Sequence, residues 1–141
     1  MYGDTTVIRA HARRMRERGE RMRGDAEALL GCAEAVPWTG LAADAMRRLA
    51  RDHAGRLRHC AAAHDSAAAA LERHAREVDR LKELIATIER RVLAVLDSAA
   101  SGLAGLVGHV LPDALGRWAH DFDPPPHGSL AWLDVRLPRP A

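Results

Sequence analysis

The sequence predicts an all-α protein organised around a long antiparallel helical hairpin, and three observations support this fold class. Apolar residues recur every three or four positions through most of residues 5–97, which is the period of one face of an α-helix. Alanine dominates the apolar residues and only 4% of the chain is aromatic, which favours closely packed helices over a sheet. Residues 36–41 form the only strong break in the first hundred residues, so two helices are expected to meet there.

This break has the residues of a turn between helices. Pro37 lacks an amide proton and disfavours helical geometry at the preceding residue, so the first helix is expected to end near residue 35. Thr39 can cap the following helix, and Gly40 gives the turn backbone freedom. Trp38 is therefore expected at the tip of the hairpin, as a core residue or as an anchor between the two helices.

The first helix carries a seam with the spacing of a coiled coil. Asp4 or Thr5 can cap its start. Small residues on the seam allow a neighbouring helix to approach closely, and the two methionines can adapt to an irregular surface. The seam therefore predicts packing against other helices. Its members alternate at four- and three-residue steps and are Ile8, Ala12, Met15, Gly19, Met22, Ala26 and Leu29.

The second helix is expected to run from residue 41 to about residue 97, because no proline interrupts its pattern. Its predicted inward stripe begins with Met46, Leu49, His53, Leu57 and Cys60. The first helix, folded back from the turn, can cover this stripe only to about residue 72 of the second helix, and the stripe continues beyond that point. The remaining stripe is too apolar to stay exposed, so another segment must cover it. That stripe consists of Val78, Leu81, Ile85, Ile88, Val92 and Val95.

The last third of the chain offers one cover for this stripe. A turn near residue 100 would place residues 103–120 back along the second helix as short helices interrupted at Pro112. Three prolines from residue 124 end regular structure, and the apolar tail that follows can dock on its own chain or add to a partner as a strand. The predicted units are a hairpin at residues 1–99, a helical cap at 100–123 and a Pro-rich extended tail at 124–141.

Composition and motifs argue against catalysis, cofactors and nucleic-acid binding. Acidic residues interrupt the arginines of the first helix and no aromatic residues interleave with them, so nucleic acid is not expected. Cys60 and His64 have metal-ligand spacing, but two ligands do not make a site, and no metal or cofactor is predicted. No phosphate-binding loop or catalytic motif is present, and a mid-helix cysteine is usually a small core residue, so the chain is not expected to be an enzyme.

Trp38-x-Gly40 at the turn, followed by the alanine-rich start of the second helix, resembles the WXG-motif family of small Esx-like proteins handled by type VII secretion systems. The resemblance covers about residues 5–80. It implies a helical hairpin that pairs with another helical protein into a four-helix bundle, as a heterodimer or a homodimer. The family's Tyr-x-x-x-Asp/Glu signal after the second helix is absent, since Tyr2 is the only tyrosine.

The resemblance implies a non-catalytic interaction protein of a type VII pathway. It would be made in the cytoplasm, either as a substrate secreted without a cleaved signal peptide or as a targeting partner or chaperone of a larger WXG- or LXG-type effector. Trp38 and Gly40 match the family's turn. The residues expected to bind a partner are Ile8, Met15, Met22, Leu29, Leu49, Leu57, Leu71, Val78, Leu81, Ile85 and Ile88.

Two other functions remain open from the sequence. Residues 92–111 form an apolar-looking window long enough to span a bilayer, which predicts a membrane-active helical effector or reversible membrane contact. Asp97 and His109 lie within this window, and no aromatic belt or basic flank marks its ends. The other alternative is a cytosolic coiled-coil scaffold unrelated to secretion.

Overall fold

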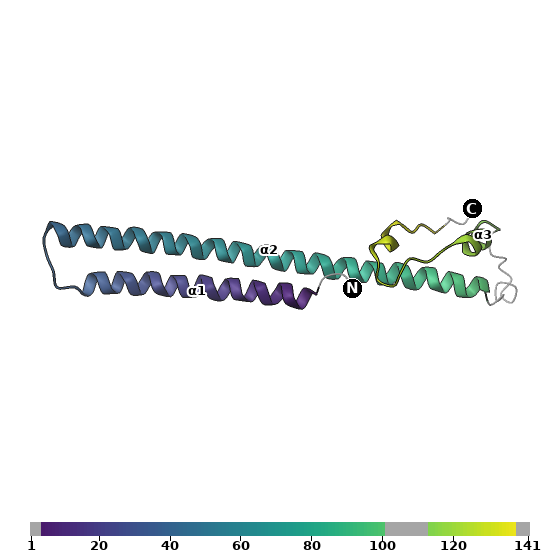
Figure 1. Ribbon diagram of the computed structural model, residues 1–141, viewed down its shortest axis with the longest axis horizontal. Helices are drawn as coiled ribbons and strands as arrows, with labels where there is room; N and C mark the ends of the chain where they lie inside the picture. The colour runs from purple at the N-terminus through teal and green to yellow at the C-terminus, as the bar shows by residue number, and fades with distance from the viewer. Residues whose placement is uncertain (1–3, 101–112, 138–141) are drawn as a thin grey trace. The chain divides into compact units, whose positions relative to one another are not determined.

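The computed structural model describes residues 4–100 and 113–137, and all the regular structure in these residues is helical (Figure 1). Helix α1 spans Thr5–Ala35, α2 spans Leu41–Ala100, α3 spans Asp113–Asp121, and the 3-10 helix η2 spans Leu130–Asp134. Helices α1 and α2 pack together as a hairpin, which confirms the all-α prediction. The chain divides into two compact units, the hairpin unit of residues 4–76 and the C-terminal unit from residue 77 onward.

Both ends of α1 follow from local sequence. Asp4 is the N-cap, and its Oδ1 accepts a hydrogen bond of 2.9 Å from the backbone N–H of Thr6. A carboxylate at this position satisfies one of the free amides of the first turn. At the other end α1 stops at Ala35 with an extended residue before Pro37, as the ring of that proline requires.

The connection between α1 and α2 is held by one arginine. Arg47 of α2 donates hydrogen bonds from Nη2 to the carbonyl oxygens of Val36 at 3.1 Å and Trp38 at 2.8 Å. Gly40 has a φ of 101°, a left-handed geometry that favours glycine, and the residue after it begins α2. Trp38 is 49% exposed, so the first of the two expectations for its side chain, a buried core residue, is wrong.

The two helices of the hairpin unit meet through small residues spaced seven apart, which we call the alanine seam. Every member is buried, and since the unit contains only these two helices, each helix covers the other. Small side chains permit a close approach of the helix backbones. The seam consists of Ala12, Gly19, Ala26 and Ala33 of α1 with Ala54, Ala61, Ala68 and Ala75 of α2.

Gly19 lies close to the backbone of α2 across the seam. A Cβ atom at this position would lie 3.0 Å from Oδ1 of Asp65 and 3.2 Å from the backbone carbonyl oxygen of Ala61. The aspartate can move, but the carbonyl belongs to a helix backbone and cannot. Gly24, on the same helix, would meet nothing within 4 Å and is exposed.

Replacing Gly19 with leucine is expected to destabilise the hairpin by about 1–2 kcal/mol. Overpacking against a helix backbone costs about 1–3 kcal/mol, and the better helix propensity of leucine returns up to about 1 kcal/mol. Gly24→Leu is the matched control and should stabilise the protein slightly for the same propensity reason. Urea unfolding followed by circular dichroism compares the two. Equal effects of the two variants would contradict the close approach at Gly19.

The C-terminal unit has a core of larger side chains. Ile85 and Val92 of α2 and Trp132 of η2 form its buried centre, and Trp132 is only 1% exposed. Trp118 and Phe122 pack against this centre with ring centroids 4.6 Å apart, and Phe122 lies 6.3 Å from Trp132. The residues of the chain's own C-terminal segment therefore cover part of the distal stripe of α2.

The tail forms a short helix where the sequence suggested extended structure. Ser129 caps η2, because its Oγ accepts a hydrogen bond of 3.2 Å from the N–H of Ala131. Gly128 has a φ of 69°, which turns the chain into this helix. The indole Nε1 of Trp132 donates to the carbonyl of Pro126 at 3.0 Å, so the buried ring has a partner for its polar atom.

Among the described residues of the C-terminal unit, Glu89 has a buried carboxylate. Glu89 is 8% exposed, and its Oε1 lies 2.6 Å from Nδ1 of His127. A buried carboxylate needs such a partner because loss of its hydration is costly. The histidine ring itself is exposed, so the pair sits at the edge of the core.

Some predicted features lie outside the described residues. These are the interruption at Pro112 and most of the turn and cap expected from residue 100 to residue 112. The distal part of the apolar window at 92–111 also falls there. Among the described residues, no helix is long and apolar enough to cross a membrane.

Candidate functional site

Cross-helix ion pairs identify one side of the hairpin unit, which we call the paired-charge face. Arg16 bonds to Glu72, and Arg23 bonds to Asp65. Each of these residues follows a seam residue by four positions on its helix. The rows four residues after the seam therefore lie on the same side of both helices.

These ion pairs shift the pKa values of Glu72 and Arg23. The hydrogen bond from Arg16 holds the pKa of the Glu72 carboxyl below its ordinary value. The hydrogen bond to Asp65 raises the pKa of Arg23, which stays charged at any physiological pH. A lowered carboxyl pKa stabilises the fold above the unfolded pKa, and this contribution is lost as pH falls through the folded value. Because these groups are exposed to solvent, the contribution is small.

Replacing Arg16 with glutamine should therefore raise the pKa of Glu72 towards its ordinary value. Titration of the carboxyl carbon by NMR measures this shift directly. Glu77 is the internal control, because its pKa is lowered by Arg80 and not by Arg16. An unchanged pKa for Glu72 in Arg16→Gln, or an equal shift at Glu77, would contradict the pairing across the helices.

The opposite side of the hairpin unit is apolar, and we call it the apolar face. Its residues follow the seam by three positions on each helix, so they lie together on the side away from the ion pairs. None of them is a lysine, arginine, aspartate or glutamate. All are half-buried except Val36, which is 38% exposed. The apolar face consists of Ile8, Met15, Met22, Leu29, Val36, Leu57, His64 and Leu71.

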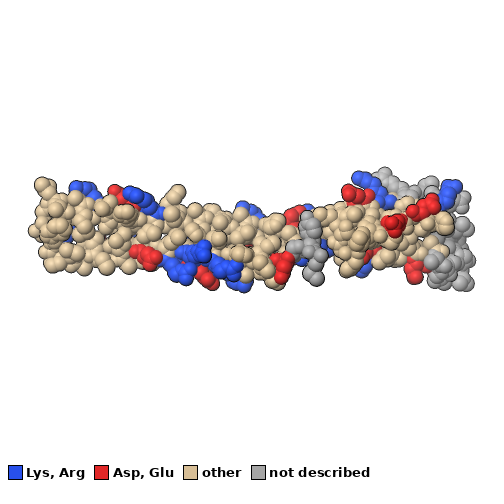
Figure 2. Space-filling view, viewed as in Figure 1, with Lys and Arg blue, Asp and Glu red and all other residues tan. Residues whose placement is uncertain are grey.

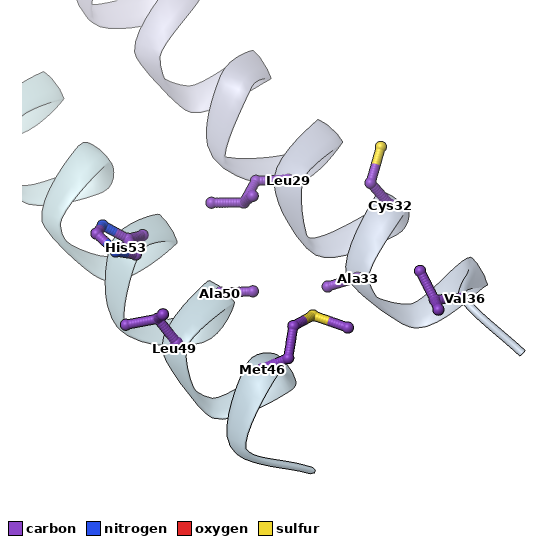
Figure 3. Close-up of a pocket in the computed structure, with 8 residues that line it drawn as sticks. All are labelled: Leu29, Cys32, Ala33, Val36, Met46, Leu49, Ala50 and His53. Atoms are coloured by element: carbon purple, nitrogen blue, oxygen red, sulfur yellow. The ribbon is translucent and has the colours of Figure 1, made fainter. Parts of the chain in front are cut away.

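The apolar face opens into a groove near the connection. The groove has a volume of about 330 Å³. In Figure 3, Ala33 and Ala50 point towards each other across the space between the helices, and Leu29 and Met46 extend into it from opposite sides. Larger side chains therefore border the groove, while Ala33 of the seam and the buried Ala50 form its floor. Its complete lining is Leu29, Cys32, Ala33, Val36, Met46, Leu49, Ala50 and His53.

Exposed apolar side chains continue from the groove to the tip. Trp38 is 49% exposed, Leu41 is 90% exposed and Leu49 is 53% exposed. Figure 2 shows mostly uncharged surface at the end of the hairpin nearest the connection, with charged side chains gathered farther along. Large exposed apolar groups gathered in one place are typical of a binding surface.

The structure separates the predicted partner-binding residues into two groups. Seven of them lie in the hairpin unit, and all but Leu49, which lines the groove, belong to the apolar face. The other four lie in the C-terminal unit, where Val78 and Ile85 are 6% and 3% exposed within the chain itself. Leu81 and Ile88 are half-buried there. The hairpin unit is therefore the better candidate for a binding site.

Sequence reasoning missed Cys32, Val36, Met46 and His53 as members of the candidate site. Val36, Met46 and His53 each follow a buried alanine by three positions, and Cys32 directly precedes the buried Ala33. Alanines at positions 54, 61, 68 and 75 repeat every seven residues, which could have defined the seam and so the rows beside it.

The metal-ligating residue types are dispersed among the described residues. Within them no group of three or more histidine, cysteine, aspartate or glutamate side chains is placed to hold a metal ion. Both cysteines are free and exposed. Comparison of the chain with protein-family models, with curated proteins and with solved structures found no match.

Proposed function

We propose that this chain is a non-catalytic helical interaction protein that binds another helical protein through its apolar face. The observation that carries the proposal is the placement of large side chains beside the alanine seam rather than in it. A hairpin closed only by small residues buries little apolar area, and its methionines and leucines remain half-exposed on one side. Helices of a partner packed on that side would complete a four-helix bundle.

We further propose that the protein works in a type VII secretion pathway, as a substrate or as the targeting partner of a helical effector. What supports this is the resemblance of Trp38-x-Gly40 to the WXG motif. These residues lie in the connection between two helices, where the motif is expected. In this proposal the connection is a turn of the WXG type, and the C-terminal helices pack back on α2 as a cap.

Co-expression with helical proteins encoded beside its gene tests the proposal. A partner of this kind should co-purify with the wild-type chain and be lost with Leu57→Glu, which places a charge on the apolar face. Ala62→Glu is the matched control, because Ala62 is exposed on the other side of α2. Equal capture by both variants would contradict binding through the apolar face. Dependence of the partner's export on the chain tests the secretion pathway separately.

A further inference from the structure

Residues 126–135 form a compact turn that is held together by its own hydrogen bonds. The backbone N–H of Ser129 donates to the carbonyl oxygen of Pro126 at 3.0 Å, and the N–H of Trp132 donates to the carbonyl oxygen of Ser129 at 3.2 Å. The carbonyl oxygen of Pro126 also accepts the hydrogen bond from the indole of Trp132. The shape of this segment therefore comes largely from its own contacts rather than from contacts with α2.

One apolar and one polar side chain make the main contacts between this segment and α2. The indole of Trp132 is buried against Ile85 and Val92, whereas the other apolar residues of the segment are only partly buried there. Nδ1 of His127 lies 2.6 Å from Oε1 of Glu89, and this is the hydrogen bond found between the segment and the described part of α2. One aromatic anchor with one orienting polar contact is the way in which many peptide ligands bind.

The carboxylate of Glu89 lies within the surface that receives the indole. Glu89 follows Ile85 by four positions and precedes Val92 by three, so the three side chains share one face of α2. Replacing a buried ionic pair by apolar residues often leaves a core equally stable or more stable, so a permanently closed core does not need this carboxylate. A carboxylate in an apolar site instead selects an occupant that brings a hydrogen-bond donor, as His127 does.

We propose that this face of α2 is a binding site for a tryptophan-bearing segment of a partner protein, and that residues 126–135 occupy it as an internal competitor. The site consists of Ile85, Glu89 and Val92, and we call it the distal site. The segment that fits it carries an indole in a short helical turn and a histidine or basic side chain five residues earlier, which is the chemistry of the occupant seen in the structure. The inference goes beyond the proposed function, because the distal site lies in the C-terminal unit and not on the apolar face.

The internal segment controls how tightly the distal site binds a segment from another molecule. Because the two are linked in one chain, the internal segment acts at an effective concentration on the order of millimolar. A segment supplied by another molecule has to displace it first. Substitutions that weaken the internal segment should therefore increase the affinity of the full chain for the same segment supplied separately.

A fluorescently labelled synthetic peptide of residues 121–137 tests this competition. The full chain with Trp132→Ala should bind the peptide about a hundredfold more tightly than the wild-type chain, because the internal segment has lost its buried anchor. The full chain with His127→Ala should bind it about fivefold more tightly, because one hydrogen bond of the internal segment is lost. His120→Ala is the matched control, an exposed histidine of α3, and should bind the peptide like the wild type.

Fluorescence anisotropy measures these affinities, and hydrogen exchange locates the bound peptide. In the Trp132→Ala chain, the peptide should restore the protection of residues 85–92 that loss of the indole removes. A peptide that carries the Trp132→Ala change should neither bind nor restore protection. If the Trp132→Ala chain loses helical structure, His127→Ala carries the test, because the side chain of His127 is 91% exposed and its truncation leaves the apolar core packed.

Three results would overturn the inference. Equal peptide affinities for the wild-type, His127→Ala and Trp132→Ala chains would show that residues 126–135 do not compete for the site. Peptide binding that leaves exchange of residues 85–92 unchanged would show that the site lies elsewhere. A wild-type dimer that dissociates when the peptide is added would show that a second copy, and not a partner protein, supplies the occupant. None of these results affects the test of the apolar face with Leu57→Glu, so the proposed function stands or fails separately.

Discussion

Trp132→Ala is expected to destabilise the C-terminal unit by about 3–5 kcal/mol, the usual range for truncating a buried tryptophan. The ring is 1% exposed, lies at the centre of the Ile85 and Val92 cluster and donates a hydrogen bond to Pro126. Its removal leaves a cavity and takes away the contact with Phe122. Hydrogen exchange should therefore become faster in residues 85–92 of α2 and in the C-terminal segment.

Trp38→Ala is the matched control for this experiment. Trp38 is 49% exposed at the tip of the hairpin, so the same truncation there should cost less than about 1 kcal/mol. Thermal unfolding and hydrogen exchange of the two variants separate the predictions. Unchanged protection of residues 85–92 in Trp132→Ala would contradict the buried core assigned to the C-terminal unit.

Ala61→Leu is expected to destabilise the hairpin unit by about 3 kcal/mol, at the upper end of the range for overpacking. Ala61 is fully buried in the seam, and its carbonyl oxygen lies 3.2 Å from the Cβ position of Gly19. Alanine and leucine have similar helix propensities, so the substitution returns nothing to offset the clash. The helices must separate to accommodate the larger side chain.

Ala63→Leu provides the control for seam packing, because Ala63 is exposed two residues along the same helix. Its effect should stay within about 0.5 kcal/mol. Urea unfolding followed by circular dichroism measures both variants. Similar unfolding midpoints for Ala61→Leu and Ala63→Leu would show that the seam is not closely packed.

The positions of the long helices were predictable because local chemistry determines them. The structure confirms that α1 ends at Ala35, as Pro37 requires, and α2 runs to Ala100 where the sequence predicted about 97. Thr39, however, was expected to cap α2, and the helix instead begins directly after Gly40. Helix capping depends on the exact path of the turn, which a residue pattern does not specify.

The residues of α2 that pack against α1 were predicted less well. A prediction from hydrophobicity places leucine rather than alanine in the interface, whereas the close approach of two helix backbones needs the smaller residue. Leu49 was placed on the inward stripe and is 53% exposed, whereas Ala50 beside it is 6% exposed. The burial of Trp132 depends on contacts with residues about 40 positions away, which no local pattern reveals. The candidate face also needed a long-range observation, since the pairing of Arg16 with Glu72 shows which rows lie on the same side.

The hydrogen bonds from Arg47 to the connection have a consequence for any molecule that touches the tip. A loop that is already fixed by its own chain loses little conformational freedom when it is covered. The indole of Trp38 is thus displayed on a preorganised support, and a ligand docking on it would not have to order the backbone first. Without the Arg47 guanidinium, any ligand that docks on Trp38 would have to order the loop backbone as it binds.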